Sequence, residues 1–189
     1  MGSARQLTVG RQNAQRAATF RTPGRAGTSG QHIFSLYNGS ASVKKAILDS
    51  LVVDMTATVV KAVTVLPPAV RIYKVTVAPT NGTAVTKVPM DSNYASSSSV
   101  TVLQDASADG TSSASALTAT LPAGTVVDHM FAPRLITAAG AELSDSIQFD
   151  VSGLTLHAGE GIVVGLDYVL ATQNPVTDMW LVRCDWIEV

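Results

Sequence analysis

The sequence has one cysteine, few aromatic residues and little charge in its 189 residues. The single cysteine, Cys184, rules out an internal disulfide framework and a zinc site built from several cysteines. Charged residues make up 14% of the chain, against about 25% in an average globular domain. Small polar and apolar residues must therefore cover much of the surface, a composition that favours a place inside an assembly.

Long apolar runs are missing as well. Asp49, Asp54 and Lys61 interrupt the best candidate for a membrane span before it reaches the ~18 residues that a span needs. The first thirty residues contain arginines but no apolar segment of the kind found in a secretory signal. We therefore expect a soluble protein that makes no membrane contact and is produced without export.

Recognisable catalytic and metal-binding motifs are also absent. His32, His129 and His157 lie far apart and form no zinc-ligand pattern. The chain has no G-x-S-x-G motif, although a Ser-His-Asp triad is defined by geometry and stays open on sequence alone. Cys184 alternates with apolar residues, as a core side chain does. We predict no catalytic, cofactor-binding or metal-binding residues, no cofactor, and no enzymatic activity.

Two short stretches imitate ligand-binding loops. "DASADG" at 105–110 has the opening spacing of an EF-hand calcium loop, but position twelve is Ala116 where glutamate is required. "GEG" at 159–161 has the glycines of a phosphate-binding loop, but no helical pattern follows it. Apolar residues recur there at every second position from Ile162 onward, which indicates a strand. We interpret the first stretch as a solvated loop tip, with weak calcium binding as the alternative, and the second as a turn.

The chain from His32 onward is dominated by patterns typical of β-strands. "HIFSLYN" alternates and ends at the turn signal Asn38-Gly39. The final "WLVRCDWIEV" places four residues on one face, which we predict to be buried. These are Trp180, Val182, Cys184 and Trp186. Residues 43–55 fit helical spacing as well as any strand template, but their valine content and flanking strands favour a strand.

The spacing of about eight to ten short strands and their turns predicts an all-β fold. We expect an antiparallel β-sandwich or jelly-roll-like domain over residues 31–189. A stretch rich in serine, alanine and threonine at 92–120 is predicted to be a long loop with one short strand at 100–103. A loop of this length is either functional or a contact segment.

Residues 1–30 have a different composition, with five arginines and no acidic residue. Such a polar segment is disordered unless something ties it down, so we predict an extended basic arm that lies on a partner. The arginines are four to six residues apart, without lysine clusters or aromatic neighbours, which argues against nucleic acid as that partner. The predicted partner-binding residues are Arg5, Arg11, Arg16, Arg21 and Arg25.

Taken together, four features resemble the small β-sandwich structural proteins of tailed-bacteriophage virions. They are the arm without acids, the "LYNGS" turn, the "LTLHAGEGIVVGLDY" hairpin and the tryptophan-bearing last strand, and the resemblance covers most of residues 32–189. It implies a non-enzymatic head-decoration (cement) protein, made in the host cytoplasm and bound to the capsid surface of the virion. The implied partners are the major capsid protein and copies of the chain itself, with the arm lacing neighbouring subunits of a homo-oligomer.

Several alternatives stay open. Within the structural class, they are a tail, collar or fibre-base component, and a single jelly-roll coat protein whose arm faces the genome. A carbohydrate-binding module would need exposed aromatic side chains on a sheet face, and aromatics make up only 5% of the chain. A hydrolase has the least support, because no acid/base pair has a distinctive setting.

Overall fold

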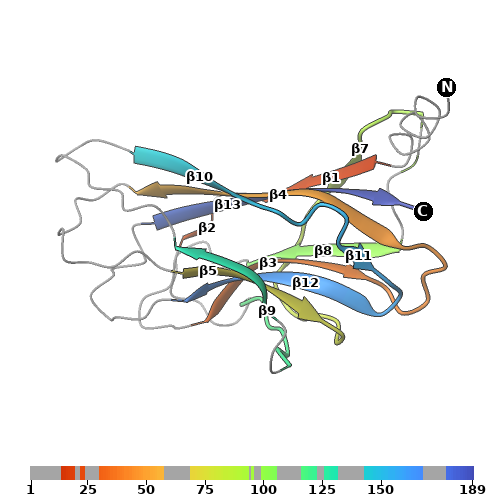
Figure 1. Ribbon diagram of the computed structural model, residues 1–189, viewed down its shortest axis with the longest axis horizontal. Helices are drawn as coiled ribbons and strands as arrows, with labels where there is room; N and C mark the ends of the chain where they lie inside the picture. The colour runs from red at the N-terminus through yellow and green to blue at the C-terminus, as the bar shows by residue number, and fades with distance from the viewer. Residues whose placement is uncertain are drawn as a thin grey trace.

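The fold is built from two antiparallel β-sheets that face each other (Figure 1). The computed structural model describes residues 14–19, 22–23, 30–57, 69–93, 95, 99–105, 116–122, 126–131, 143–167 and 178–189. Within these ranges every regular element is a β-strand. The prediction of an all-β antiparallel sandwich is therefore confirmed.

The first sheet has the strand order β10-β4-β13-β1-β7. The strands are β1 (Ala14–Ala18), β4 (Ala46–Ala57), β7 (Lys87–Pro89), β10 (Leu143–Phe149) and β13 (Asp178–Glu188). Two short strands join it, β2 (Thr22–Pro23) on β13 and β11 (Thr155–Leu156) on β4.

The second sheet has the order β6-β8-β3-β12-β5-β9. Its strands are β3 (Gln31–Asn38), β5 (Ala69–Val75), β6 (Thr83–Ala84), β8 (Val100–Gln104), β9 (Val126–Phe131) and β12 (Glu160–Asp167).

Four nested strand pairs define the topology. β1 pairs with β13, β3 with β12, β4 with β10 and β5 with β9, so early strands meet late ones throughout. The members of successive pairs fall alternately in the two sheets, as in a long hairpin folded over itself, which is the jelly-roll arrangement. Strands β6, β7 and β8, between β5 and β9 in the chain, extend both sheets at one side. The jelly-roll-like prediction is confirmed.

The segment with ambiguous periodicity, residues 43–55, forms the turn before β4 and most of β4 itself, so the strand interpretation holds. Its register against β13 shifts where Asp185 pairs with Ser50 but Trp186 pairs with Leu48, so Asp49 is an extra residue in the ladder. Such a β-bulge moves the buried positions by one residue. Leu48 and Leu51 are therefore both buried although they are three apart, which imitates a helical period.

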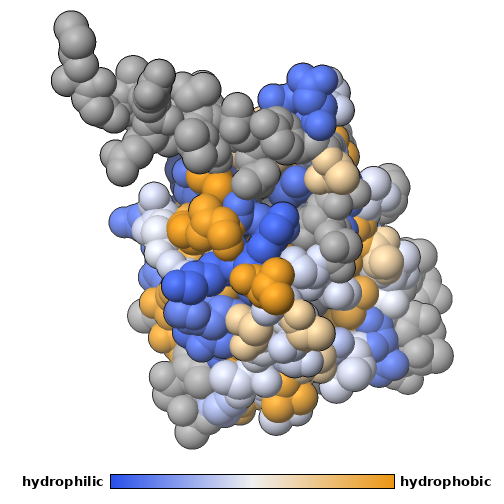
Figure 2. Space-filling view, turned by 90° about the vertical axis from the view of Figure 1, so that its right-hand side faces the viewer, coloured by the Kyte–Doolittle hydropathy of each residue, from blue (hydrophilic) through white to orange (hydrophobic). Residues whose placement is uncertain are grey.

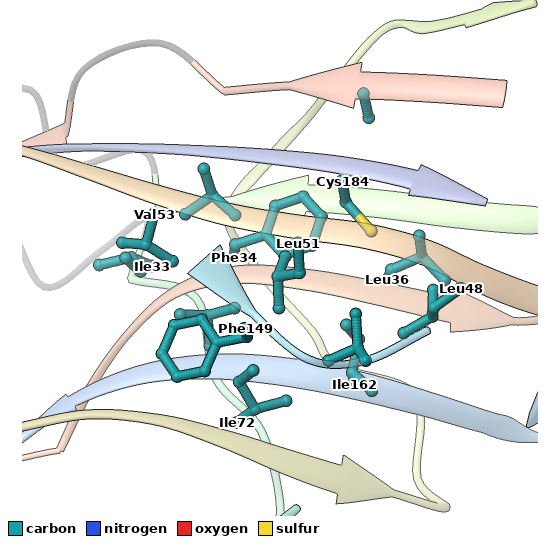
Figure 3. Close-up of a cluster of buried hydrophobic side chains, with 14 of the residues drawn as sticks. Ile33, Phe34, Leu36, Leu48, Leu51, Val53, Ile72, Phe149, Ile162 and Cys184 are labelled. Carbon is teal, nitrogen blue, oxygen red and sulfur yellow. The ribbon is translucent and has the colours of Figure 1, made fainter. Parts of the chain in front are cut away.

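The core lies between the sheets and is filled from both. In Figure 3, Phe34, Leu51, Phe149 and Cys184 point into the space between the two layers. Trp180, Val182 and Trp186 belong to the same core cluster as Cys184. The predicted buried face of the last strand is thus confirmed.

The sandwich begins earlier in the chain than the predicted boundary at residues 30 and 31. β1 and β2, which we assigned to the arm, pair with β13 inside the first sheet. Polar composition did not prevent this, because a β-ladder is made by backbone groups and needs apolar side chains only on its inner face. Of the predicted arm, residues 1–13, 20–21 and 24–29 lie outside the described residues.

Replacing Trp186 with Ala should lower the free energy of unfolding by ~3–5 kcal/mol, because the side chain is fully buried and its loss leaves a cavity. Urea unfolding followed by circular dichroism measures this change. Val43→Ala is the control, since Val43 is 99% exposed and should change the value by less than ~0.5 kcal/mol. Equal unfolding midpoints for Trp186→Ala and the wild type would contradict the packing described above.

Candidate functional site

The most distinctive site is the place of the N-terminal strand β1 inside the first sheet. β1 lies between β13 and β7 and is paired with both. Its pairing continues beyond the strand, because Thr19 N donates to Val182 O at 2.9 Å and Val182 N donates to Thr19 Oγ1 at 2.9 Å. At the other end Met90 N donates to Ala14 O at 2.8 Å. Backbone hydrogen bonds on both sides therefore hold the segment.

On the outer face of this sheet, an ion pair joins β1 to β13. The Arg16 guanidinium donates through Nε to Asp185 Oδ1 at 2.7 Å and through Nη2 to Asp185 Oδ2 at 2.8 Å. Ser50 Oγ on β4 adds a hydrogen bond to Asp185 Oδ2 at 3.1 Å. This two-pronged geometry is the strong form of an arginine–carboxylate contact. Three adjacent strands are thus connected through one carboxylate.

The environment of Asp185 favours its charged form. Burial alone would raise the pKa of this carboxyl, but the hydrogen bond and charge of Arg16, together with the Ser50 hydroxyl, hold it below its ordinary value. The same contact raises the pKa of Arg16. Asp185 therefore stays ionised at neutral pH and keeps its attraction for the guanidinium.

On the inner face, β1 adds little apolar material. Ala17 is its only residue in the main core cluster, and Gln15 and Thr19 are buried beside it. Gln15 Nε2 donates to Ala95 O at 3.3 Å. The segment is consequently held more by hydrogen bonds and one ion pair than by hydrophobic packing.

Of the five predicted partner-binding arginines, only Arg16 lies among the described residues. It contacts Asp185 of the same chain, a pairing across 169 residues that no sequence pattern indicated. Arg5, Arg11, Arg21 and Arg25 lie outside the described residues.

The end of the sandwich at which β1 begins also carries exposed apolar side chains. Figure 2 looks onto this end, where apolar groups lie beside strongly polar ones. Val43, on the turn between β3 and β4, is 99% exposed, and Val189, which follows β13, is also exposed. Lys45 N and Val189 N each donate to the other residue's carbonyl oxygen, at 2.9 and 3.0 Å, which fixes the turn against the chain end. This arrangement presents apolar groups on an ordered support.

The glycine corner at 159–161 is a turn that leads from β11 into β12, as predicted. Gly159 has a φ of 81°, a conformation that favours glycine. A Cβ on Gly161 would lie 2.6 Å from Leu36 O, so this glycine is needed for close strand packing. Glu160 accepts from His157 N at 2.9 Å and forms an ion pair with Lys74 at 2.9 Å. Each residue of the corner thus has a structural role.

The stretch at 105–110, which has the spacing of a calcium loop, begins with a carboxylate that already accepts hydrogen bonds within the chain. Asp105 is buried and accepts hydrogen bonds from Gln31 Nε2 at 2.9 Å and from Leu117 N at 3.3 Å. Residues 106–115 lie outside the described part of the chain. Within the long segment 92–120, the short strand expected at 100–103 is present as β8.

The three histidines and the cysteine lie on separate elements. His32 is half-buried in β3, His129 is in β9 opposite Arg71, and His157 is exposed before the glycine corner. Cys184 is fully buried, and burial, followed by the charge of Asp185, raises the pKa of its thiol far above the ordinary value. Among the described residues no three side chains of the metal-ligating types form a group.

The described residues include no helix with the length and apolar character of a membrane span. No protein-family model, curated protein or solved structure matches the chain.

We expect Arg16→Met to lower the free energy of unfolding at pH 7 by up to about 1 kcal/mol, since the ion pair is partly exposed. The pKa of Asp185 is depressed in the folded state, so this stabilisation is lost as the pH falls through that pKa. Urea unfolding at pH 7 and in strong acid, at pH 2, should therefore show the two proteins converging in acid. Lys45→Met, at an exposed position, is the matched control. A constant difference at both pH values would exclude a charge effect.

Cys184 should not react with a thiol reagent in the folded protein, because the reactive species is the exposed thiolate and this thiol is buried and protonated. Labelling by Ellman's reagent should become complete only in denaturing urea. Rapid labelling of the folded chain would show that β13 is accessible and that the packing around this residue is different.

Proposed function

We propose that the chain is a non-enzymatic structural protein of a virus particle, most simply a capsid decoration protein at the outer surface. The observation that carries this proposal is the nested jelly-roll pairing of its strands, an architecture that recurs in viral capsid domains. Fold alone does not specify function, and the surface of the chain adds further support.

Two surface features support an assembly role. The chain is poor in charge, and large apolar side chains such as Val43, Met90 and Val189 are exposed. The basic residues Arg5 and Arg11 precede β1 in the chain, and β1 starts at the end of the sandwich that carries Val43 and Val189. The major capsid protein and further copies of the chain are the partners that we propose for this end.

Jelly rolls are also found in lectins, which keeps a carbohydrate-binding module as the competing class. Sugar binding on a sheet face relies on accessible aromatic rings. Trp180 and Trp186 are 1% and 0% exposed, so neither can stack on a sugar. Tyr37 is buried and Tyr73 is half-buried. Among the described tryptophans and tyrosines these burials favour the structural role, and Tyr94 and Tyr168 lie outside the described residues.

The rest of the chemistry agrees with a non-catalytic protein. A buried, protonated Cys184 is a poor nucleophile, and the glycine corner serves strand packing. Within the structural class, a single jelly-roll coat protein is the alternative that the fold favours most. A tail, collar or fibre-base component would differ in its place on the particle.

The test is to purify the virus particles that contain the chain and to treat them with stepwise increasing denaturant. A decoration protein should sediment with intact particles and then be released while closed, genome-filled heads persist in electron micrographs. Loss of the shell together with the protein would instead favour the coat-protein alternative. Absence of the chain from the particle fraction would overturn the proposal.

A truncated chain that lacks residues 1–13 should fold normally, since the described sandwich begins at Ala14. Removing Arg5 and Arg11 should weaken its rebinding to stripped heads by about tenfold or more, because the contacts of this segment with the head are lost. A tenfold loss corresponds to about 1.4 kcal/mol of binding free energy. Arg5→Ala with Arg11→Ala in the full chain is the matched control for charge alone. Rebinding that equals the wild type would show that this segment makes no contact with the head.

A further inference from the structure

We infer that the N-terminal strand is exchangeable, so that in the assembled protein residues 14–23 of one copy fill the place between β13 and β7 of a neighbouring copy. The occupant of this surface is therefore a second copy of the chain. The inference rests on the proposed function only in requiring that copies of the chain assemble.

The first reason is the nature of the contacts. Within this segment, β1 and β2 pair with β13, from Ile187 opposite Ala14 to Met179 opposite Pro23. On the other side β7 pairs with Gln15, Arg16 and Ala17. None of these partners is near the segment in sequence, so the identical segment of another copy can make every one of the same contacts. This equivalence is the basis of strand exchange between protomers.

The second reason is that little of the core depends on the segment. Ala17 is the only residue of β1 in the main core cluster, whereas β13 contributes Trp180, Val182, Cys184 and Trp186 to it. Withdrawal of β1 would remove a methyl group from the core, together with hydrogen bonds and the Arg16–Asp185 pair. The sandwich can therefore remain folded while the segment moves.

The third reason is the connection. A single connector, residues 24–30, joins the segment to β3 in the opposite sheet, and Gly24, Gly27 and Gly30 punctuate it. Gly30 has a φ of 78°, which only glycine adopts without strain. Seven extended residues span about 25 Å at most. This reach allows exchange with a copy in direct contact and excludes a distant one.

The vacated place would not stay empty. Asp185 is 16% exposed and its two oxygens accept from Arg16, so losing the guanidinium would leave a half-buried carboxylate with Ser50 as its remaining side-chain donor in the described contacts. The carboxylate is modestly less stable without this partner, as is typical of a partly exposed pair, so an occupied place is favoured. Exchange must therefore be reciprocal around a closed set of copies, each giving one segment and receiving one.

A charge-reversal experiment tests the exchange directly. Arg16→Asp and Asp185→Arg each place like charges together within one chain, and each protein should have a lowered Tm and poor assembly. When the two variants are unfolded, mixed and refolded, exchange between them creates only opposite-charge pairs at both junctions. We expect the mixture to recover the Tm and the oligomer mass of the double variant, which carries both changes in one chain and is the control for folding.

Recovery in the double variant without recovery in the mixture would overturn the inference. A strand that pairs only within its own chain keeps its like-charge contact, whichever other chain is present. Oligomer mass is measured by light scattering after size-exclusion chromatography. A wild-type chain that forms no oligomer, either in solution or on particles, also contradicts it. The charge-reversal measurements use purified protein and do not involve virus particles. Their failure would therefore reject strand exchange and would not decide whether the chain belongs to a particle.

A covalent probe provides an independent measurement. Ala17 lies directly opposite Cys184, and paired Cα atoms in such a ladder are about 5.5 Å apart, within the range of about 4.4–6.8 Å that a disulfide bridges. When Ala17→Cys protein is refolded and assembled under oxidising conditions, exchange should give disulfide-linked dimers or larger species on a non-reducing denaturing gel. The same change in a Cys184→Ala background is the control and should give none. Linkage confined to single chains would overturn the exchange.

Discussion

The hydrogen-bond ladder of β13 is the interaction on which the rest of the molecule depends. This strand pairs with β4 along eleven of its residues and with β1 and β2 on its other edge. Its inner face supplies Trp180 and Trp186 to the core, while its outer face holds Asp185 between Arg16 and Ser50. One strand thereby determines the register of the first sheet, the filling of the core and the place of the N-terminal segment.

The sequence predicted the parts of this arrangement that follow from local alternation. The buried face of β13 could be read directly, because every second residue from Trp180 to Trp186 is apolar. β4 was ambiguous for a physical reason: the bulge at Asp49 shifts the buried positions and makes Leu48 and Leu51 imitate a helical repeat. The number and spacing of the strands predicted a jelly-roll-like domain, but no local pattern indicated which distant strands pair with each other.

The N-terminal segment shows where sequence reasoning stops. Composition alone suggested an arm apart from the domain, because Gln15, Arg16 and Thr19 are polar. What places them in the sheet is a ladder of backbone bonds and a carboxylate 169 residues away, neither of which leaves a local pattern. The same polarity means that backbone hydrogen bonds and one ion pair, with little hydrophobic contact, hold this strand in the sheet.

The nesting of early strands with late ones also sets the order of events at the ribosome. β1 is synthesised long before β13. A domain generally folds as a unit, so β1 waits until the last strand has been made. Throughout that interval the segment carrying Arg16 has no β13 of its own chain to pair with. Pairings so distant in sequence also form slowly, because the loop between them must close first.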